Sequence, residues 1–339
     1  MARIAIIGLG LIGGSLGLAL KRSRLRDVEI SGFSRSRETR EKARKMGAVD
    51  YVASDPADAV RGASIAVIAT PILIIPQTMK DIAADLPEGC VVTDVASTKT
   101  QVMKWAQELL PPAVSFVGGH PMAGKEQSGV AAADGTLFDG KPYCVVPSVG
   151  AKETAVNAVI GLADLVGATP LFMDAAEHDS YVAAISHLPL VVSTALFSLA
   201  RESAAWPEMS RLASSGFRDV TRLASGSPEM SEDICRTNRE NVVHWLDRMV
   251  AELRKYRRLV EGDDEEALFE VFTRVKQERD DFLAAGVMPR REERAEAPGI
   301  GISDLLMGKW VARRTREAMK SLEQEPPVRR RRHRLAKEQ

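Results

Sequence analysis

Short apolar runs alternate with amphipathic stretches along roughly the first half of the chain. The runs are rich in β-branched residues and have the length of strands, whereas the stretches between them repeat apolar residues at helical spacing. In the runs at residues 64–69 and 90–95, apolar residues occupy both alternating positions, which is typical of strands buried on both faces of a parallel sheet. Further strands are expected at residues 3–7, 28–33, 114–118, 142–146 and 168–173, and helices at 11–21 and 37–46. The alternation predicts an α/β domain over residues 1–173, built on a doubly wound, mostly parallel sheet.

The pattern changes after Asp174, because residues 174–287 contain few glycines and long apolar repeats at helical spacing. This second part is expected to form an all-α domain. Its segment 181–200, YVAAISHLPLVVSTALFSLA, is apolar almost all round, so we expect it to be buried on every side. One small helical domain can hardly cover such a helix. We therefore expect a homodimer formed through the helical domain.

Residues 288–339 form a basic tail that follows the helix breakers Gly286 and Pro289. The tail contains the sequence EPP and four consecutive arginines at residues 329–332. A basic end can contact nucleic acid or an acidic partner, but a flexible, solvated tail is the more ordinary role of such a segment. No nucleic-acid partner is therefore expected.

The overall composition narrows the classes of function. The 339 residues carry 46 Lys and Arg against 46 Asp and Glu, and this balance argues against a protein that coats nucleic acid. No uninterrupted apolar run reaches the roughly 18 residues of a membrane span, and the N-terminal apolar run lacks a signal-peptide cleavage pattern. A cytoplasmic protein without membrane contact is expected. The three cysteines lie far apart without ligand spacing, so we expect neither a disulfide framework nor a metal site.

A glycine-rich motif, GLGLIG, directly follows the first expected strand and opens the first expected helix. In that context Gly8 permits a tight turn, Gly10 lets the backbone approach a pyrophosphate, and Gly13 lets helix and strand pack closely. The amides at the helix start, among them those of Leu11 and Ile12, then face the phosphates. The motif predicts a dinucleotide site, and the alternative is a glycine-rich turn that binds no ligand.

The end of the second expected strand bears on which dinucleotide is bound. An acidic residue there would accept hydrogen bonds from ribose hydroxyls and repel a 2′-phosphate. This chain instead has Ser34, Arg35 and Ser36, whose hydroxyls and guanidinium suit a phosphate better and favour NADP. Alternatively, Arg35 stacks on adenine and NAD is still accepted. Further cofactor-binding candidates, directly after the strand at residues 64–69, are Thr70 and Pro71.

Two polar segments, DVASTK and GGHPMAGKEQSG, lie at the ends of neighbouring expected strands. These ends border the cofactor crevice of a doubly wound sheet. The second segment contains His120, which does not lie on an apolar helix face as a core histidine would. Its neutral imidazole can accept a proton near neutral pH, so we predict that it is the base for dehydrogenation of an alcohol. Ser97 is expected to hold the imidazole or the substrate hydroxyl, and Lys99 is a candidate substrate contact.

The helical domain contributes His187 and a pair of arginines, Arg218 and Arg222. The histidine lies within an apolar helix, where a satisfied core histidine is the ordinary interpretation. The arginines are four residues apart and could present their guanidinium groups on one helix face to a substrate that bears carboxylates. Alternatively, they form surface ion pairs with Asp219 and Glu229.

Taken together, the segments GLGLIGGSLG, TDVASTK, GGHPMAGKEQSG, HDSYVAAISHLP and SGFRDVTRLASGSP resemble the prephenate/arogenate dehydrogenase family of tyrosine biosynthesis. The resemblance covers about residues 1–285. It implies a Rossmann-type dinucleotide-binding domain followed by a helical dimerisation domain. It also implies oxidative decarboxylation of prephenate to 4-hydroxyphenylpyruvate, or of arogenate to tyrosine, with hydride transfer to nicotinamide.

The resemblance also implies roles for individual residues. His120 is similar to the catalytic base that polarises the ring 4-hydroxyl, and Ser97 to a residue bonded to both the histidine and the substrate. Arg222 resembles the arginine that binds a substrate carboxylate, and His187 a second histidine that helps to seat the substrate. Glu126 matches an acidic residue at the mouth of the active site.

Two departures from the family pattern limit what the resemblance implies. Members often carry an aromatic residue where this chain has Ser231, which leaves open how prephenate is told from arogenate. Some members carry a C-terminal regulatory ACT domain, for which the tail lacks the alternating strands. A β-hydroxyacid dehydrogenase is the nearest rival, although such enzymes usually rely on a lysine base in the helical domain. A non-catalytic NADP-binding sensor is a more distant alternative.

Overall fold

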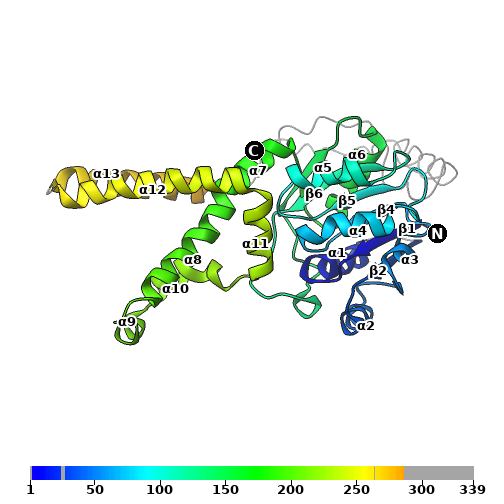
Figure 1. Ribbon diagram of the computed structural model, residues 1–339, viewed down its shortest axis with the longest axis horizontal. Helices are drawn as coiled ribbons and strands as arrows, with labels where there is room; N and C mark the ends of the chain where they lie inside the picture. The colour runs from blue at the N-terminus through cyan, green and yellow to red at the C-terminus, as the bar shows by residue number, and fades with distance from the viewer. Residues whose placement is uncertain (1, 24–26, 263, 286–339) are drawn as a thin grey trace, which may run out of the picture.

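The computed structural model describes residues 2–23, 27–262 and 264–285, and these residues form a sheet-based domain followed by a helical one (Figure 1). The last strand of the sheet ends at Phe172, and the first helix of the second part begins at Ala175. The expected basic tail at residues 288–339 and the expected absence of an ACT domain there both lie outside the described residues.

The first domain is built on one eight-stranded sheet in the order β3-β2-β1-β4-β5-β6-β7-β8. Neighbouring strands are parallel except for β6 and β7, which are antiparallel. The strands are β1 (Ala2–Ile7), β2 (Val28–Phe33), β3 (Tyr51–Val52), β4 (Ile65–Ile68), β5 (Val91–Asp94), β6 (Ser115–Pro121), β7 (Pro142–Pro147) and β8 (Thr169–Phe172). The predicted doubly wound, mostly parallel sheet is confirmed, and β3 is the strand that the apolar pattern missed because it has two residues.

Helices cover both faces of this sheet. They are α1 (Leu11–Arg22), α2 (Arg37–Lys45), α3 (Pro56–Val60), α4 (Ile75–Ile82), α5 (Thr100–Leu109) and α6 (Glu153–Leu165). Along β1, Ile4 and Ile6 join an apolar cluster on one face, while Ala5 and Ile7 join a second cluster on the other. Because alternate side chains of a strand point to opposite faces, a strand covered on both sides must be apolar at every position.

The chain reverses direction across the sheet between β1 and β4. From β1 the chain continues through β2 to β3 towards one edge, and it then returns to place β4 on the other side of β1. Such a reversal leaves a crevice at the carboxyl ends of the two central strands, where doubly wound sheets bind their ligands. The glycine-rich motif follows β1 at this point.

The second domain is entirely helical in the described residues. Its elements are α7 (Ala175–Val182), a π-helical turn (Ala183–His187), α8 (Leu188–Arg201), α9 (Trp206–Leu212), α10 (Ser215–Thr221), a 3₁₀ turn (Arg222–Ser225), α11 (Pro228–Thr237), α12 (Arg239–Glu261) and α13 (Glu265–Ala285). Figure 1 shows α12 and α13 side by side as an arm that projects away from the sheet. The rings of Tyr256 on α12 and Phe272 on α13 lie 6.1 Å apart within this arm. Towards the sheet, α7 packs on α5, and α11 packs on the 3₁₀ turn before α4.

The helical run Ala175–Arg201 leaves much of its apolar surface open in the protomer. Ile185 is 71% exposed and Leu199 is 73% exposed, so one chain alone does not cover residues 181–200, and the expected burial on every side would need a partner chain. The other helices of the domain cover only part of its circumference. By length and composition alone the run could also cross a membrane, which the expectation of no such segment did not anticipate. Exposed apolar side chains and a long apolar sequence are also found in helices that pack at subunit interfaces.

Candidate active site

The glycine-rich turn after β1 has the geometry of a dinucleotide site. Gly8 has a φ of +106°, and a Cβ added there would lie 2.4 Å from the carbonyl oxygen of Ala69. A Cβ on Gly13 would lie 1.9 Å from the carbonyl oxygen of Gly8, whereas one on Gly10 would meet nothing within 4 Å. Gly8 and Gly13 are therefore required by packing, and Gly10 leaves space for a ligand to approach the backbone. Because no side chain caps α1, its first amides are available to an anion.

The other residues predicted at this turn border the same space. Leu11 and Ile12 open α1 and are half-buried. Thr70 is also half-buried, and its backbone nitrogen would lie 2.8 Å from a Cβ on Gly8, so the end of β4 adjoins the turn. Pro71 follows and is exposed.

The turn between β2 and α2 presents an arginine to solvent. Arg35 is exposed and forms no ion pair with any residue that the structure describes. Its backbone is held by Arg40, whose guanidinium donates hydrogen bonds to the carbonyls of Ser34 and Arg35. The hydroxyl of Ser36 accepts from the backbone N–H of Thr39 and caps α2. Arg35 is thus the side chain of this turn with its charge uncommitted.

A buried ion pair lies beneath the ends of β5 and β6. Asp94 and Lys99 are both fully enclosed, and the Lys99 ammonium donates to the Asp94 carboxylate and, at 2.7 Å, to the carbonyl oxygen of Gly119. The other oxygen of Asp94 accepts from the Gly119 N–H at 3.2 Å. Removing one partner of such a pair typically costs about 3–5 kcal/mol, because the other charge is left buried. Lys99 therefore clamps the backbone next to His120, and its enclosure corrects the prediction that it contacts substrate.

His120 ends up at the carboxyl end of β6, half-buried, with one ring nitrogen engaged. Its Nδ1 lies 2.8 Å from Nε2 of His178. Burial, with added effects from His178, Lys99 and His187, holds the pKa of His120 well below its usual range. The hydrogen bonds of the described residues include none between His120 and Ser97, which is half-buried on the loop after β5. The predicted contact between Ser97 and the imidazole is thus not formed in the described residues, where the hydrogen-bond partner of His120 is His178.

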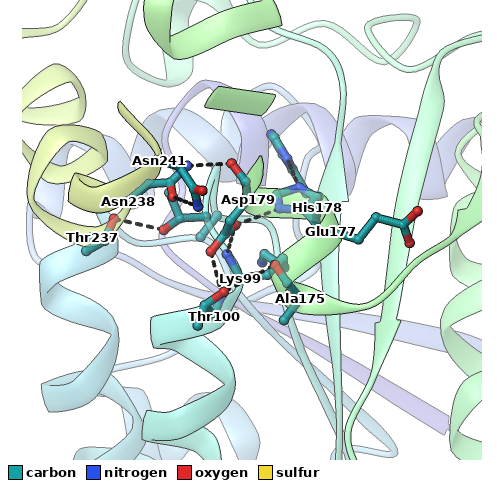
Figure 2. Close-up of polar contacts among 12 residues, drawn as sticks. Lys99, Thr100, Ala175, Glu177, His178, Asp179, Thr237, Asn238 and Asn241 are labelled. Atoms are coloured by element: carbon teal, nitrogen blue, oxygen red, sulfur yellow. Dashed lines mark hydrogen bonds and ion pairs between the residues drawn. The ribbon is translucent and has the colours of Figure 1, made fainter. Parts of the chain in front are cut away.

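Asp179 supports the second histidine and also ties the two domains together, as Figure 2 shows. Its carboxylate lies 2.8 Å from Nδ1 of His178 and accepts from the backbone N–H groups of Lys99, at 2.7 Å, and Thr100, at 2.8 Å. Burial alone would raise the pKa of Asp179, but these hydrogen bonds outweigh it and lower the pKa. Sequence reasoning assigned no role to His178 or Asp179. The signal that could have found them is a His-Asp pair at the start of the helix that joins the two domains.

His187 is buried at the end of the π-helical turn. Its Nδ1 lies 3.1 Å from the side-chain amide nitrogen of Asn238, which also donates to the backbone carbonyl of Asp179 at 2.7 Å. Burial lowers the pKa of His187 to about 4, so the ring is uncharged near neutral pH. With Nδ1 accepting from the amide, the remaining proton of the neutral ring is on Nε2. His187 is therefore a buried histidine that is hydrogen-bonded through Nδ1, and its role in seating a substrate stays a prediction.

Arg222 joins the helical domain to the loop after β6. Its guanidinium donates to the carboxylate of Glu126, so the structure brings these two predicted site residues together. This partner replaces the surface alternatives Asp219 and Glu229. Arg218 is exposed on α10, one turn before, and has no ion-pair partner among the described residues.

Family models match both parts of the chain. A model described as the prephenate dehydrogenase nucleotide-binding domain matches residues 16–171, and one described as the prephenate dehydrogenase dimerization domain matches residues 174–274. The prephenate dehydrogenase of Bacillus subtilis is 37% identical over 279 residues, which cover 82% of this chain and 75% of that protein. The cyclohexadienyl dehydrogenase of Zymomonas mobilis is 31% identical over 81% of this chain and 94% of its own length.

Solved structures of prephenate and arogenate dehydrogenases are similar to this chain as well. The prephenate dehydrogenase of Aquifex aeolicus, in complex with hydroxyphenyl propionate and NAD⁺, has a TM-score of 0.77 at 29% identity. That alignment covers 83% of this chain and 98% of the other. The arogenate dehydrogenase of Synechocystis has a TM-score of 0.70 at 31% identity, and the alignment covers 82% and 99% of the two chains.

We expect the His120 imidazole to stay uncharged when the pH is lowered through 6.5, because burial disfavours its protonated form. Titration of the histidine ring signals by NMR measures this, with free histidine in the same tube as the reference. The signal lost in His120→Asn identifies the residue. A His120 ring that titrates together with free histidine would contradict this prediction.

Proposed function

Since the chain belongs to the prephenate dehydrogenase family, we propose that it oxidises prephenate to 4-hydroxyphenylpyruvate with loss of CO₂. The hydride leaves the ring carbon that bears the hydroxyl and passes to a nicotinamide dinucleotide. The ring carboxylate leaves as CO₂, and the ring becomes aromatic. The observation that carries the proposal is His120, an uncharged imidazole at the carboxyl end of β6 with one nitrogen engaged by His178.

His120 acts on the ring hydroxyl. As the hydride departs, positive charge develops at the carbon that bears this hydroxyl, and a neutral imidazole that accepts its hydrogen bond stabilises that charge. Aromatisation drives the reaction, so the protein mainly has to orient the ring and exclude water. His187 offers a neutral donor from the helical domain.

The substrate carboxylates are matched by the arginines. Arg222 lies at the contact between the domains and is held by Glu126. A carboxylate of prephenate would join or replace Glu126 on this guanidinium, and a planar guanidinium binds carboxylates well. Arg218 adds a second positive charge one helical turn away.

NADP is the proposed dinucleotide. Arg35 is uncommitted and follows β2, where the 2′-position of the adenosine ribose lies in this fold. The turn holds no carboxylate that would repel a 2′-phosphate. NAD is the alternative, since the Aquifex aeolicus relative was solved with NAD⁺.

Arogenate is the second candidate substrate, because the related chains include an arogenate dehydrogenase and a cyclohexadienyl dehydrogenase. It differs from prephenate by an amino group in place of the side-chain keto group. The β-hydroxyacid dehydrogenase alternative is disfavoured because Lys99, the one lysine that is fully buried among the described residues, belongs to the sheet domain and is paired with Asp94. A non-catalytic sensor would have no need of a base at His120.

The protein is further proposed to be a homodimer through the helical domain. Exposed apolar side chains lie along the run from α7 to α8 and on the α13 arm, among them Ile185, Leu199, Phe269 and Phe282. A patch of this kind marks an interface, and the matching family model describes a dimerization domain.

The reduced cofactor absorbs near 340 nm, so the assay mixes the protein, NADP⁺ or NAD⁺, and prephenate or arogenate. We expect turnover with prephenate and a fall in kcat of about 10²–10⁴-fold in His120→Asn, the usual size of an acid–base contribution. The exposed His244 on α12 supplies a matched control, His244→Asn, which should match the unmodified protein. No turnover of either substrate would overturn the proposed function.

Arg35→Ala should raise KM for NADP⁺ about tenfold or more, since a hydrogen bond to a charged group contributes about 1.5–3 kcal/mol. KM for NAD⁺ should stay nearly unchanged, because NAD lacks the 2′-phosphate. Arg37→Ala is the control, since Arg37 is exposed nearby and paired with Glu41. A preference of the unmodified protein for NAD⁺, or an equal loss with both cofactors, would remove the NADP assignment.

Light scattering should give twice the mass of one chain. Leu199→Asp should shift the protein towards monomer by placing a charge in the apolar interface. Gln107→Asp, an exposed position on α5 of the sheet domain, should leave the mass unchanged. A monomer in the unmodified protein contradicts the proposed dimer.

A further inference from the structure

A chain of hydrogen bonds runs from the helical domain to His120. It starts at the Asp179 carboxylate, passes through both ring nitrogens of His178 and ends at His120 Nδ1, with 2.8 Å at each ring contact. His178 is 0% exposed and Asp179 is 1% exposed, so water does not compete for these groups. In the described residues the His178 ring has no other hydrogen-bond partner.

The direction of the first hydrogen bond follows from the charge of Asp179. Its carboxylate already accepts the backbone N–H groups of Lys99 and Thr100. An ionised carboxylate has acceptors and no donor. His178 must therefore donate from Nδ1, which fixes the proton of the neutral ring on that atom.

The second hydrogen bond then has one possible direction. With its proton on Nδ1, a neutral His178 ring presents an acceptor at Nε2. The facing atom, His120 Nδ1, must be the donor. A neutral His120 that carries its proton on Nδ1 has a bare lone pair on Nε2, which is the state required of a base.

We propose that His178 and Asp179 are positioning residues that hold His120 in the Nδ1–H tautomer and direct its bare Nε2 towards the substrate hydroxyl. The role in catalysis rests on the proposed function, whereas the tautomer does not. The Asp94–Lys99 clamp fixes the backbone beside His120, but it leaves the imidazole free to rotate about its side-chain bonds. The bond to His178 removes that freedom.

The charges around His120 agree with this arrangement. Lys99 and Asp94 form a closed pair at the end of β5, and His187 of the π-helical turn is close enough to help lower the pKa of His120. The negative charge of Asp179 acts on His120 through the His178 ring and stabilises positive charge that develops on the imidazole when it polarises the hydroxyl. Asp179 lies on α7 while His120 lies on β6, so the orientation of the base depends on how the two domains pack.

Substitutions of His178 separate this role from a packing role. His178→Leu fills a similar volume and removes the acceptor, so kcat should fall about 10²-fold or more, the scale of a misdirected catalytic histidine. KM for prephenate and for the dinucleotide should change less than about threefold, because the fully buried His178 side chain is not accessible to either ligand. His178→Gln can place its amide oxygen near the former Nε2 and accept from His120, and it should recover at least about tenfold of the lost kcat.

The tautomer itself is measured without any substrate. Two-bond ¹H–¹⁵N NMR spectra of the protein labelled at histidine distinguish protonated from bare ring nitrogens, and the loss of signals in His120→Asn identifies His120. We expect Nδ1 protonated and Nε2 bare in the unmodified protein, and the opposite tautomer or a mixture in a folded His178→Leu protein.

A proton on Nε2 of His120 in the unmodified protein would overturn the proposal, whether or not the enzyme turns over prephenate. It would also be overturned by unchanged kcat in His178→Leu, or by parallel losses of kcat and both KM values with no recovery in His178→Gln. If neither prephenate nor arogenate is oxidised, the proposed function fails and the NMR result still decides the tautomer.

Discussion

The carboxylate of Asp179 is the contact on which the arrangement of the site depends. It accepts the backbone N–H groups of Lys99 and Thr100 at the start of α5 in the sheet domain, although it belongs to α7 of the helical domain. These N–H groups have no partner within their own helix, and the residue at the helix start supplies no cap of its own. Burying them at a domain contact would be costly without an acceptor. One carboxylate thus accepts hydrogen bonds from two N–H groups at the start of α5, joins the domains and orients His178.

The catalytic side of the sheet is held by a second buried charge. The Asp94–Lys99 pair forms hydrogen bonds with both the N–H and the carbonyl of Gly119. A Cβ on that glycine would lie 2.6 Å from the carbonyl oxygen of Asp94. The backbone at His120 is therefore positioned from below by the sheet, while its ring is positioned from the side by the helical domain. Because each attachment comes from a different domain, a change in domain packing would move the ring relative to its own strand.

The surface of the helical domain that faces the sheet differs in polarity from the surface that faces away from it. Towards the sheet it provides polar and charged groups, among them Arg222 and His187. Away from the sheet it exposes long apolar faces on α8 and α13, which a single chain leaves uncovered. The π-helical turn Ala183–His187 lies between these two regions, and such turns commonly re-aim side chains at functional sites.

The sequence by itself determined the order of the strands apart from β3 and the all-α character of the second domain. β-branched runs that are apolar at every position can be strands covered on both faces, and a glycine-rich turn after the first of them leaves few alternatives to a dinucleotide site. The sequence also allowed prediction of the site residues Gly8, Gly13, His120 and Arg222, because local context restricts what these residues can do.

Only the tertiary structure decided which side chains meet. Lys99 was predicted to contact substrate and is enclosed with Asp94, while Ser97 was predicted to bind His120, whose hydrogen bond in the described residues goes to His178. The two histidines lie 58 residues apart along the chain, and the Gly119 carbonyl that Lys99 binds is 20 residues from the lysine. Such a pairing depends on how two domains pack, and packing depends on shape and on the need to satisfy every buried polar group rather than on a local pattern.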